Sequence, residues 1–177
     1  MPHHFESYET QRLIIRPTGE EDAAFILELL NSPKWKQNIG NRNVSNLEDA
    51  KTYIQTKCTP QFQRLGFGNY TVIRKSDQVK LGTCGLYDRE GLDGIDIGFA
   101  FLPEYEKQGY AFESASRILE AALHDFNITT ISAITIKENI SSQRLLEKLG
   151  LQFEKIINIP NDEEDLMYYV LRIENEK

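Results

Sequence analysis

The sequence of 177 residues has few of the side chains that build metal centres and disulfides. Its two cysteines, Cys58 and Cys84, form no C-x-x-C pair, and its three histidines add no zinc-type spacing. We therefore expect two ordinary buried or half-buried thiols and no metal site. The motif G-x-S-x-G is absent as well, so the sequence does not support a hydrolase with that kind of serine nucleophile.

Long apolar runs and positive charge are also scarce. No segment reaches the roughly 18 apolar residues of a membrane-spanning helix, and the N-terminus lacks the basic start and apolar run of a signal peptide. The net charge of −7 repels nucleic-acid phosphates over most of the surface and attracts a cationic substrate. We expect a cytoplasmic protein that binds neither a membrane nor nucleic acid.

The most informative stretch runs from Ile95 to Phe126. Its first eight residues are rich in β-branched and aromatic side chains, which is typical of a buried strand, and Pro103 ends that strand. From Ala111 the apolar residues recur at a period near 3.6, which predicts an amphipathic helix. In the intervening EKQGYA, Gly109 lets backbone approach a ligand while the first helical N–H groups stay unpaired. This turn is a candidate anion site, although it fits neither common nucleotide-binding fingerprint and a lone turn of this kind more often binds nothing.

The rest of the chain predicts one domain over residues 1–177. Capping-box spacings, Thr18 with Glu21 and Ser45 with Glu48, predict the starts of two helices, the second ending at Cys58. The segment 34–44, which contains Trp35, is polar and aperiodic and predicts a loop. A further helix is expected from Asn139 to Lys148, with Gly150 as its C-terminal glycine. Strands besides the central one are expected at 10–17, 69–74, 79–87, 128–136, 151–159 and 165–173.

A second polar site precedes the last of these helices, in the segment KENISSQRLLEKLGLQFE, residues 137–154. Asn139 lies at a strand end and Ser142 follows three residues later, so both side chains can face the edge of the sheet that carries the turn at Gly109. The N-x-x-S and L-x-E-K-x-G of this segment resemble the second signature of the GNAT superfamily of acyl-CoA N-acyltransferases. PEYEKQGYA resembles the first signature, the pyrophosphate loop.

The resemblance covers nearly the whole chain. TQRLIIRP near the start and DLMYYVLR near the end look like the first and last strands of the ribosomal-protein-alanine N-acetyltransferase branch, the RimJ and RimL type. Together, the sequence pattern and the resemblance predict an α/β fold with a mixed, mainly antiparallel sheet of about seven strands and four helices. The sheet should be splayed at its parallel central pair, where the arm of acetyl-CoA enters.

The resemblance also assigns roles to residues of this sequence. Backbone groups at Phe99 and Phe101 would meet the pantetheine arm, Asn139 would contact the pantetheine, and Ser142 would lie near the sulfur. The amides implied to hold the pyrophosphate belong to Lys107, Gln108, Gly109, Tyr110 and Ala111.

Two positions depart from the pattern of the family. Glu106 stands where the usual residue is Arg or Gln, and this anion beside a phosphate site weakens affinity unless its side chain turns to solvent. Leu146 stands where many members have a tyrosine acid for the leaving thiolate. That proton must come from elsewhere or from water, and Ser142 is our candidate acid.

Direct attack of an amine on a thioester requires a base and an N–H donor for the oxyanion. Asp96 is the best candidate base, but a carboxylate that faces an arginine across the sheet is an equally good interpretation. We expect Glu113 to cap the N-terminus of the helix, where a carboxylate in the first turn is favourable, and not to act as a base. His124 lies roughly 20 Å along the helix from the loop by helix rise, too far to act.

We therefore expect an N-acetyltransferase that uses acetyl-CoA and acts on a primary amine, with a protein N-terminus as the first choice. A polyamine or an aminosugar is the alternative acceptor, and a catalytically silent acyl-CoA-binding module is the alternative from another class. A peptide could lie between the 35–44 loop and the acidic hairpin at Asn161 to Asp165, or this hairpin could serve solubility alone. Both a monomer and a homodimer fit the sequence.

Overall fold

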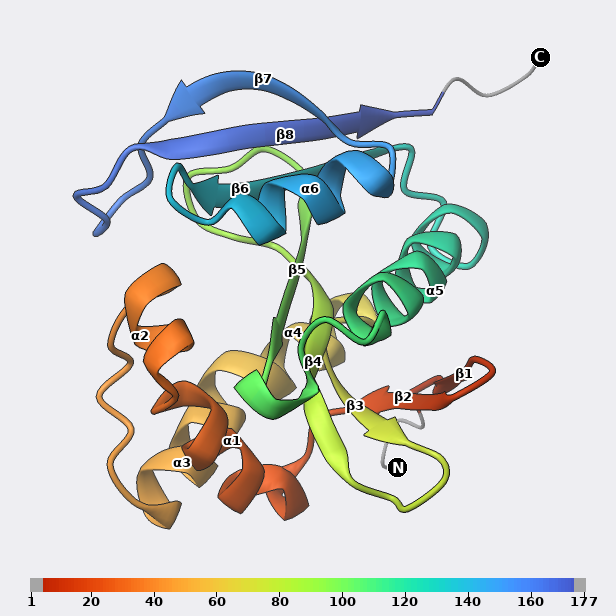
Figure 1. Cartoon of the computed structure of the whole chain (residues 1–177), viewed down its shortest axis with the longest axis vertical. Coiled ribbons are helices and arrows are strands. Elements are labelled where there is room, and N and C mark those ends of the chain that lie inside the picture. Colours follow the sequence, from red (N-terminus) through yellow and green to blue (C-terminus); the bar gives the residue numbers. More distant parts are fainter. Residues whose placement is uncertain (1–4, 174–177) are drawn as a thin grey trace.

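The computed structural model describes residues 5–173 and is organised around an eight-stranded sheet with the order β1-β2-β3-β4-β5-β6-β8-β7 (Figure 1). Neighbouring strands are antiparallel except for β5 and β6, which are parallel. This confirms the mixed, mainly antiparallel sheet, and the short β1 is one strand more than expected. The strands are β1 (Tyr8–Glu9), β2 (Leu13–Pro17), β3 (Asn69–Arg74), β4 (Lys80–Tyr87), β5 (Ile95–Phe101), β6 (Thr130–Ile136), β7 (Gln152–Ile157) and β8 (Leu166–Arg172).

Helices cover both faces of the sheet. They are α1 (Ala23–Leu30), α2 (Pro33–Asn38), α3 (Leu47–Tyr53), α4 (Thr59–Leu65), α5 (Tyr110–His124) and α6 (Ile140–Lys148). Phe101 packs in a cluster with Ile118 of α5 and Leu146 of α6, whereas Leu102 packs in another cluster with Phe25 of α1. Because consecutive residues of a strand point to opposite faces, α5 and α6 lie on one face and α1 on the other. No helix within residues 5–173 has the length and apolarity to cross a membrane.

The parallel pair is short. β5 pairs with β6 only at Ile95 with Ile131 and at Asp96 with Ser132. Beyond Asp96, β5 stays with β4 as far as Phe101, while β6 continues along β8. Figure 1 shows β5 diverging from β6, β8 and β7 as a result. The sheet is therefore splayed at its central pair, as the sequence led us to expect.

The helix starts before β3 differ from the predictions. Thr18 does not form a capping box with Glu21, because its hydroxyl bonds Thr71 and the amide of Gly19 donates to Asp22 instead. The N-cap expected at Ser45 is Asn46, whose side chain accepts from the amide of Asp49. The capping-box signal thus found both helices but was wrong about the residues that cap them.

Two other local predictions were wrong in the same region. The segment expected to be a loop contains α2, which starts at Pro33 with Ser32 as its N-cap. The helix expected to end at Cys58 continues through a π-helical turn, Ile54–Cys58, into α4, where Pro60 occupies the first turn. Proline has no N–H to donate within a continuous helix, and the wider π-helical turn lies directly before α4.

Candidate active site

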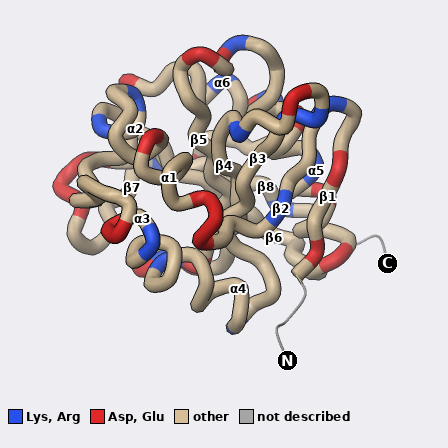
Figure 2. The backbone as a smooth tube through the Cα atoms, turned by 90° about the horizontal axis from the view of Figure 1, so that it is seen from below, with Lys and Arg blue, Asp and Glu red and all other residues tan. Residues whose placement is uncertain are grey.

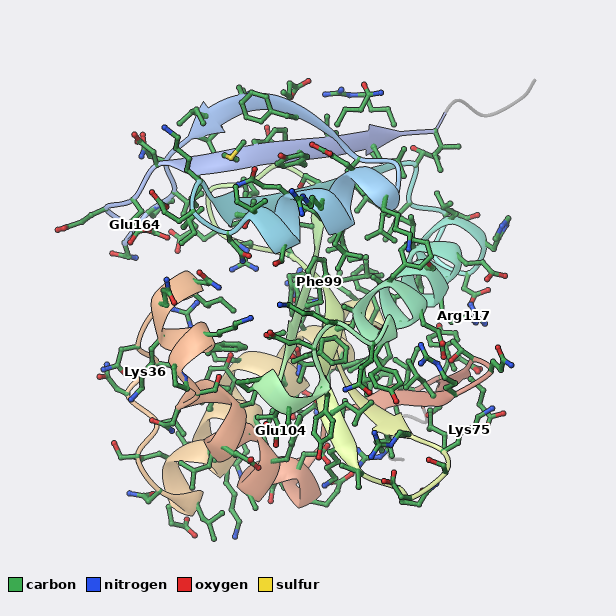
Figure 3. All side chains as sticks on the ribbon, viewed as in Figure 1. Lys36, Lys75, Phe99, Glu104, Arg117 and Glu164 are labelled. Atoms are coloured by element: carbon green, nitrogen blue, oxygen red, sulfur yellow. The ribbon has the colours of Figure 1, made fainter. Side chains whose placement is uncertain are left out.

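The splay leaves backbone groups of β5 directed into the gap between the strands. In an antiparallel ladder, every second residue turns its N–H and C=O toward the neighbouring strand. The amide of Leu102 donates to the carbonyl of Leu81 at 3.0 Å, so Leu102 and Ala100 face β4. The peptide groups of Phe99 and Phe101 therefore face the gap. Figure 3 shows Phe99 near the centre of the molecule, between its upper and lower parts.

The loop after β5 places a second set of N–H groups at the same end of the strand. Lys107 and Gly109 have positive φ of 61° and 84°, and such residues curl the backbone so that its amides converge on a concave surface. Gly109 is the N-cap of α5 and provides no side-chain cap. The first amides of α5, at Tyr110 and Ala111, are therefore available to an anion, and the helix dipole favours negative charge there.

Glu113 does not cap α5 with its side chain. It accepts hydrogen bonds from the hydroxyl of Thr10 at 2.5 Å, the amide of Arg12 at 3.1 Å and Nε of Arg12 at 2.8 Å. Although its partial burial acts in the opposite direction, these bonds lower the pKa of Glu113. These bonds hold the carboxylate toward the start of β2. Glu113 still lies in the first turn of α5, where a negative charge is favourable.

Glu106 does not turn to solvent as an unpaired anion. Its carboxylate forms an ion pair with Nζ of Lys34 on α2. A cation from the other face of the sheet thus compensates the negative charge at the opening of the loop. The sequence gives no sign of this pairing, because Lys34 and Glu106 are 72 residues apart.

Asn139 and Ser142 form the start of α6. Asn139 is the N-cap, and its Oδ1 accepts from the amide of Ser142 at 3.2 Å. Leu146 is 1% exposed and belongs to the core. Both α5 and α6 start where β5 and β6 end, and ligands of open α/β sheets bind at such strand ends. The structure therefore brings the loop, the free edge of β5 and the start of α6 to one end of the splay.

Asp96 lies at the closed end of the splay and is 1% exposed. Arg89, in the connection from β4, donates to its two carboxylate oxygens at 3.2–3.4 Å. Burial raises the pKa of Asp96, and Arg89 offsets that effect only in part. Asp96 therefore forms an ion pair with an arginine, which was one of our two interpretations of this residue. A carboxyl group with a raised pKa remains suited to accept a proton.

Ser132 was not singled out by the sequence. It is opposite Asp96 in the parallel pair, so both side chains lie on one face of the sheet. The hydroxyl of Ser132 is buried and has no hydrogen-bond partner among residues 5–173. No sequence signal marks it, because alternating isoleucines with small polar residues are ordinary in a half-buried strand.

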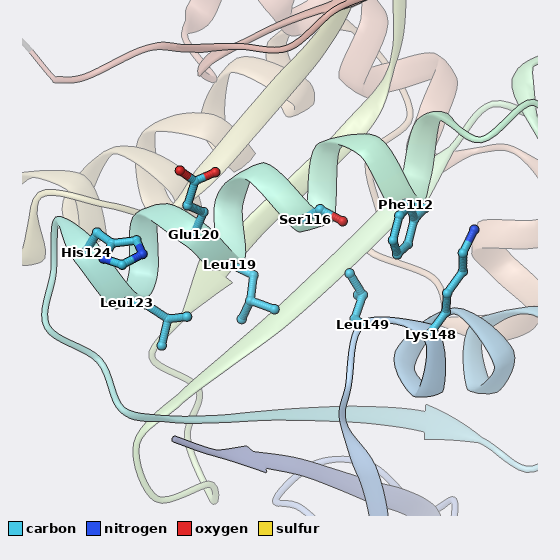
Figure 4. Close-up of a pocket in the computed structure, with 8 residues that line it drawn as sticks. All are labelled: Phe112, Ser116, Leu119, Glu120, Leu123, His124, Lys148 and Leu149. Atoms are coloured by element: carbon cyan, nitrogen blue, oxygen red, sulfur yellow. The ribbon is translucent and has the colours of Figure 1, made fainter. Parts of the chain in front are cut away.

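A pocket of about 250 Å³ lies between α5 and the C-terminal end of α6 (Figure 4). Its lining residues are Phe112, Ser116, Leu119, Glu120, Leu123, His124, Lys148 and Leu149. Nζ of Lys148 lies 4.0 Å from the centre of the Phe112 ring, in the first turn of α5. His124 lies at the opposite end of the pocket, roughly 20 Å from Gly109 by helix rise. His124 is therefore too far from the loop to contact a ligand bound there.

Trp35 and the acidic β7–β8 connection, which we expected near the acceptor, differ in exposure: the first packs against the core and the second lies at the surface. Trp35 packs against the cluster that contains α1 and α3, and its indole N–H is buried without a partner in the part of the chain that the structure describes. The connection between β7 and β8 carries exposed Glu163 and Glu164. Figure 2 shows acidic positions gathered at that connection, and Figure 3 shows Glu164 at the periphery.

Comparisons with known proteins agree with this architecture. The sequence matches the family described as "Acetyltransferase (GNAT) domain" over residues 12–152. It is 29% identical to the Bacillus subtilis (strain 168) protein "Uncharacterized N-acetyltransferase YnaD", over 92% of this chain and 94% of that protein. Its fold is similar to that of the Vibrio fischeri ribosomal-protein-S5-alanine acetyltransferase, with a TM-score of 0.79 at 19% identity over 97% and 99% of the chains. A further match is RimL, a ribosomal L7/L12 alpha-N-protein acetyltransferase in complex with coenzyme A, with a TM-score of 0.81 at 16% identity over 95% and 98%.

Proposed function

The chain belongs to the GNAT acetyltransferase family and is an acetyl-CoA-dependent N-acetyltransferase, and we propose that its acceptor is the amino group at a protein N-terminus. The acetyl group passes from the thioester to this amine by direct attack. The proposal combines a site that fits acetyl-CoA with a surface that suits a cationic peptide.

The observation that carries this proposal is the free edge of β5 beside the loop at Gly109. The pantetheine arm contains amide groups, and an extended ligand binds the edge of a strand through its main-chain groups. Phe99 and Phe101 offer such groups in the gap. The pyrophosphate fits the amides from Lys107 to Ala111, because the left-handed residues Lys107 and Gly109 turn these amides toward one concave surface. Asn139 and Ser142 border the same gap from α6.

The chain's own side chains then serve the transfer. The bond from nitrogen to the acetyl carbon forms as the bond from that carbon to sulfur breaks, and the thiolate leaves. Asp96 accepts the proton of the ammonium, directly or through water, because only a neutral amine attacks a thioester. After the attack the nitrogen loses its second proton, which passes through water to Ser142 as the hydroxyl proton of Ser142 goes to the thiolate; the proton held by Asp96 is released to solvent. A backbone N–H of β5 stabilises the oxyanion.

The acceptor approaches on the face that carries Asp96, where α2 and the β7–β8 connection lie on the same side of the molecule (Figure 1). The fold is shared with two acetyltransferases of ribosomal proteins, which supports a peptide N-terminus as the acceptor. The alternatives are a polyamine and an aminosugar, which offer the same nucleophile without an extended chain.

Isothermal calorimetry with acetyl-CoA tests the site through Gly109→Asp, which adds an anion beside the amides proposed to bind pyrophosphate and a Cβ at a left-handed position. We expect binding to be lost while the protein stays folded. The matched control is Gly66→Asp, because Gly66 has φ 83°, against φ 84° at Gly109, and a Cβ added there would have no atom within 4 Å. Equal binding by Gly109→Asp and the parent would show that the loop is not the pyrophosphate site.

Release of the CoA thiol tests the acceptor. The parent is offered peptides with free N-termini, polyamines and aminosugars at equal concentration. We expect the peptides to give the highest kcat/KM. Acetylation of polyamines or aminosugars alone would refute the peptide acceptor and leave the acetyl-CoA site in place.

A further inference from the structure

Arg12, the first residue after the turn that precedes β2, reaches the loop at Gly109 from the edge of the sheet. Nη1 of Arg12 donates to the carbonyl oxygen of Gln108 at 3.0 Å, and Nε donates to Glu113 at 2.8 Å. The guanidinium carbon lies 4.3 Å from the centre of the Tyr110 ring. Nη2 lies 3.2 Å from the position that a Cβ of Gly109 would take. One side chain therefore contacts Gln108 in the loop and Tyr110 and Glu113 in the first turn of α5, and it lies beside Gly109.

The bond to Gln108 fixes the direction of an amide. The carbonyl of Gln108 and the N–H of Gly109 belong to one planar, trans peptide unit, so they point in opposite directions. A guanidinium that holds the carbonyl on one side therefore holds the N–H of Gly109 on the other. Gln108 lies between two left-handed residues, Lys107 and Gly109, where no regular ladder sets the orientation of this peptide unit.

The bond to Glu113 has a separate effect. Glu113 lies in the first turn of α5, so its carboxylate could approach an anion at the free amides. Arg12 and Thr10 instead hold that carboxylate on the side of β2. Glu113 also balances the charge of Arg12, so the ion pair adds little net charge beside the loop.

We propose that Arg12 is a positioning residue for acetyl-CoA: it orients the Gln108–Gly109 peptide so that its N–H faces the pyrophosphate, and it holds Glu113 away from that anion. The proposal rests on the proposed binding of acetyl-CoA at this loop. It predicts a defect in binding acetyl-CoA and none in the chemical step.

The first variant is Arg12→Met, which keeps the apolar stem and removes the donors. We expect the KM for acetyl-CoA and the Kd for CoA to rise on the order of tenfold, since charge-assisted hydrogen bonds are lost, with kcat unchanged within about twofold. Arg12→Lys keeps the charge but lacks the fork that reaches both acceptors, so it should restore part of the affinity. The matched control is Arg172→Met, which removes an arginine 2.9 Å from Glu154 on the β7–β8 hairpin and should leave both constants unchanged.

Hydrogen exchange tests the orientation of the loop without any ligand. In Arg12→Met, the segment 104–112 should exchange faster than in the parent, and the segment 130–136 should not. If a folded Arg12→Met protein bound CoA with the Kd of the parent, or if exchange in segment 104–112 were unchanged, Arg12 would not position the loop. If the parent itself did not bind acetyl-CoA, the proposed function would fail, and the exchange result would still decide whether Arg12 orders the loop.

Discussion

Asp22 and Asp96 are both buried, at 0% and 1% exposure, yet the protein shifts their pKa values in opposite directions. Asp22 lies just before α1, on the part of the sheet formed by β2, β3 and β4. Asp96 lies at the closed end of the splay. Both carboxylates are hidden from solvent, and they differ in how deeply they lie within the protein and in the partners that surround them.

Asp22 is surrounded by donors. Arg16 donates to both of its oxygens at 2.8 Å, Lys80 lies at 2.7 Å, and the hydroxyl of Thr71 and the amide of Gly19 donate at 3.0 Å. Although burial acts the other way, these donors lower the pKa of Asp22 to about 2. Its charge is fixed, and the residue ties the start of α1 to the sheet.

Asp96 has Arg89 as its ion-pair partner, at 3.2–3.4 Å. These bonds do not outweigh the loss of solvation, so the pKa of Asp96 is raised. The depth of burial and the number and closeness of the donors therefore decide whether a buried carboxylate is fixed as an anion or remains open to protonation. A carboxylate fixed as an anion can hold parts of the fold together, whereas one that remains open to protonation can take part in proton transfer.

The largest effect on stability is expected for Asp22→Asn. The change leaves Arg16 and Lys80 without their anion, and breaking a buried pair of this kind costs about 3–5 kcal/mol of the free energy of unfolding. Urea denaturation measures the loss. Glu154→Gln is the control, because its ion pair with Arg172 is at the surface and is worth about 0–1 kcal/mol. Equal losses in both variants would contradict the structural role of Asp22.

The matching change at the splay, Asp96→Asn, should affect the reaction more than the fold. We expect kcat to fall by about 10²-fold or more, since general bases contribute roughly 10²–10⁴-fold, while the free energy of unfolding falls less than in Asp22→Asn. Steady-state kinetics at saturating substrates gives kcat. A kcat equal to that of the parent would leave Asp96 with the ion pair as its only role.

Lowering the pH should change the contributions of Asp22 and Asp96 to the free energy of unfolding in opposite directions. The pKa of Asp22 is about 2 in the folded chain and about 3.9 when unfolded, so its stabilisation is present above the unfolded value and is lost as pH falls toward 2, by about 2–3 kcal/mol. The raised pKa of Asp96 gives the reverse: its contribution is present at low pH and is lost as pH rises through the folded value. Urea titrations of the parent and Asp22→Asn between pH 6 and pH 2.5 should converge with decreasing pH. Curves that stay parallel would refute the assignment for Asp22.

The smallest effect concerns the surface carboxylates of the β7–β8 connection, which lack both burial and a fixed partner of the kind found at Asp22. We expect kcat/KM for basic peptides to fall a few-fold with added salt, because charges at the surface act through a screened field. Replacing Asp162, Glu163 and Glu164 by their amides should remove most of that salt dependence. An unchanged salt profile would indicate that these charges serve solubility alone.

The sequence predicted the elements well because their signals are local. The seven expected strands, the amphipathic helix α5 and the turn at Gly109 follow from periodicity and from the special backbone of glycine. The capping residues were less predictable, since Thr18 had a partner on β3, Thr71, that no local pattern encodes. Gly98 shows the same limit: a glycine within a strand predicts a bulge or a close approach of backbone, but β4 and β5 pair there in unbroken register, and the ring of Tyr87 is what would lie 3.0 Å from a Cβ.

The site was predictable where backbone defines it and not where distant side chains meet. Gly109, Phe99 and Phe101 follow from the strand, the loop and the resemblance. Arg12 lies 101 residues before Glu113, and Lys34 lies 72 residues before Glu106, so only the fold reveals these contacts. An arginine partner for Asp96 across the sheet was one of two interpretations of the sequence, and the structure identifies that partner as Arg89, seven residues away.

The shortness of the β5–β6 pair has a consequence for how the molecule opens. Two aligned positions join the sheet of β1 to β5 to the sheet of β6, β8 and β7, whereas β6 and β8 are aligned over their full length. Within the sheet, the chain from Thr130 to Arg172 is therefore joined to β5 at two positions only, and it is held otherwise by the core that it shares with α5 and β5. Few backbone hydrogen bonds thus keep the sheet closed beside the gap that admits a ligand, and the packing of side chains has to do so instead.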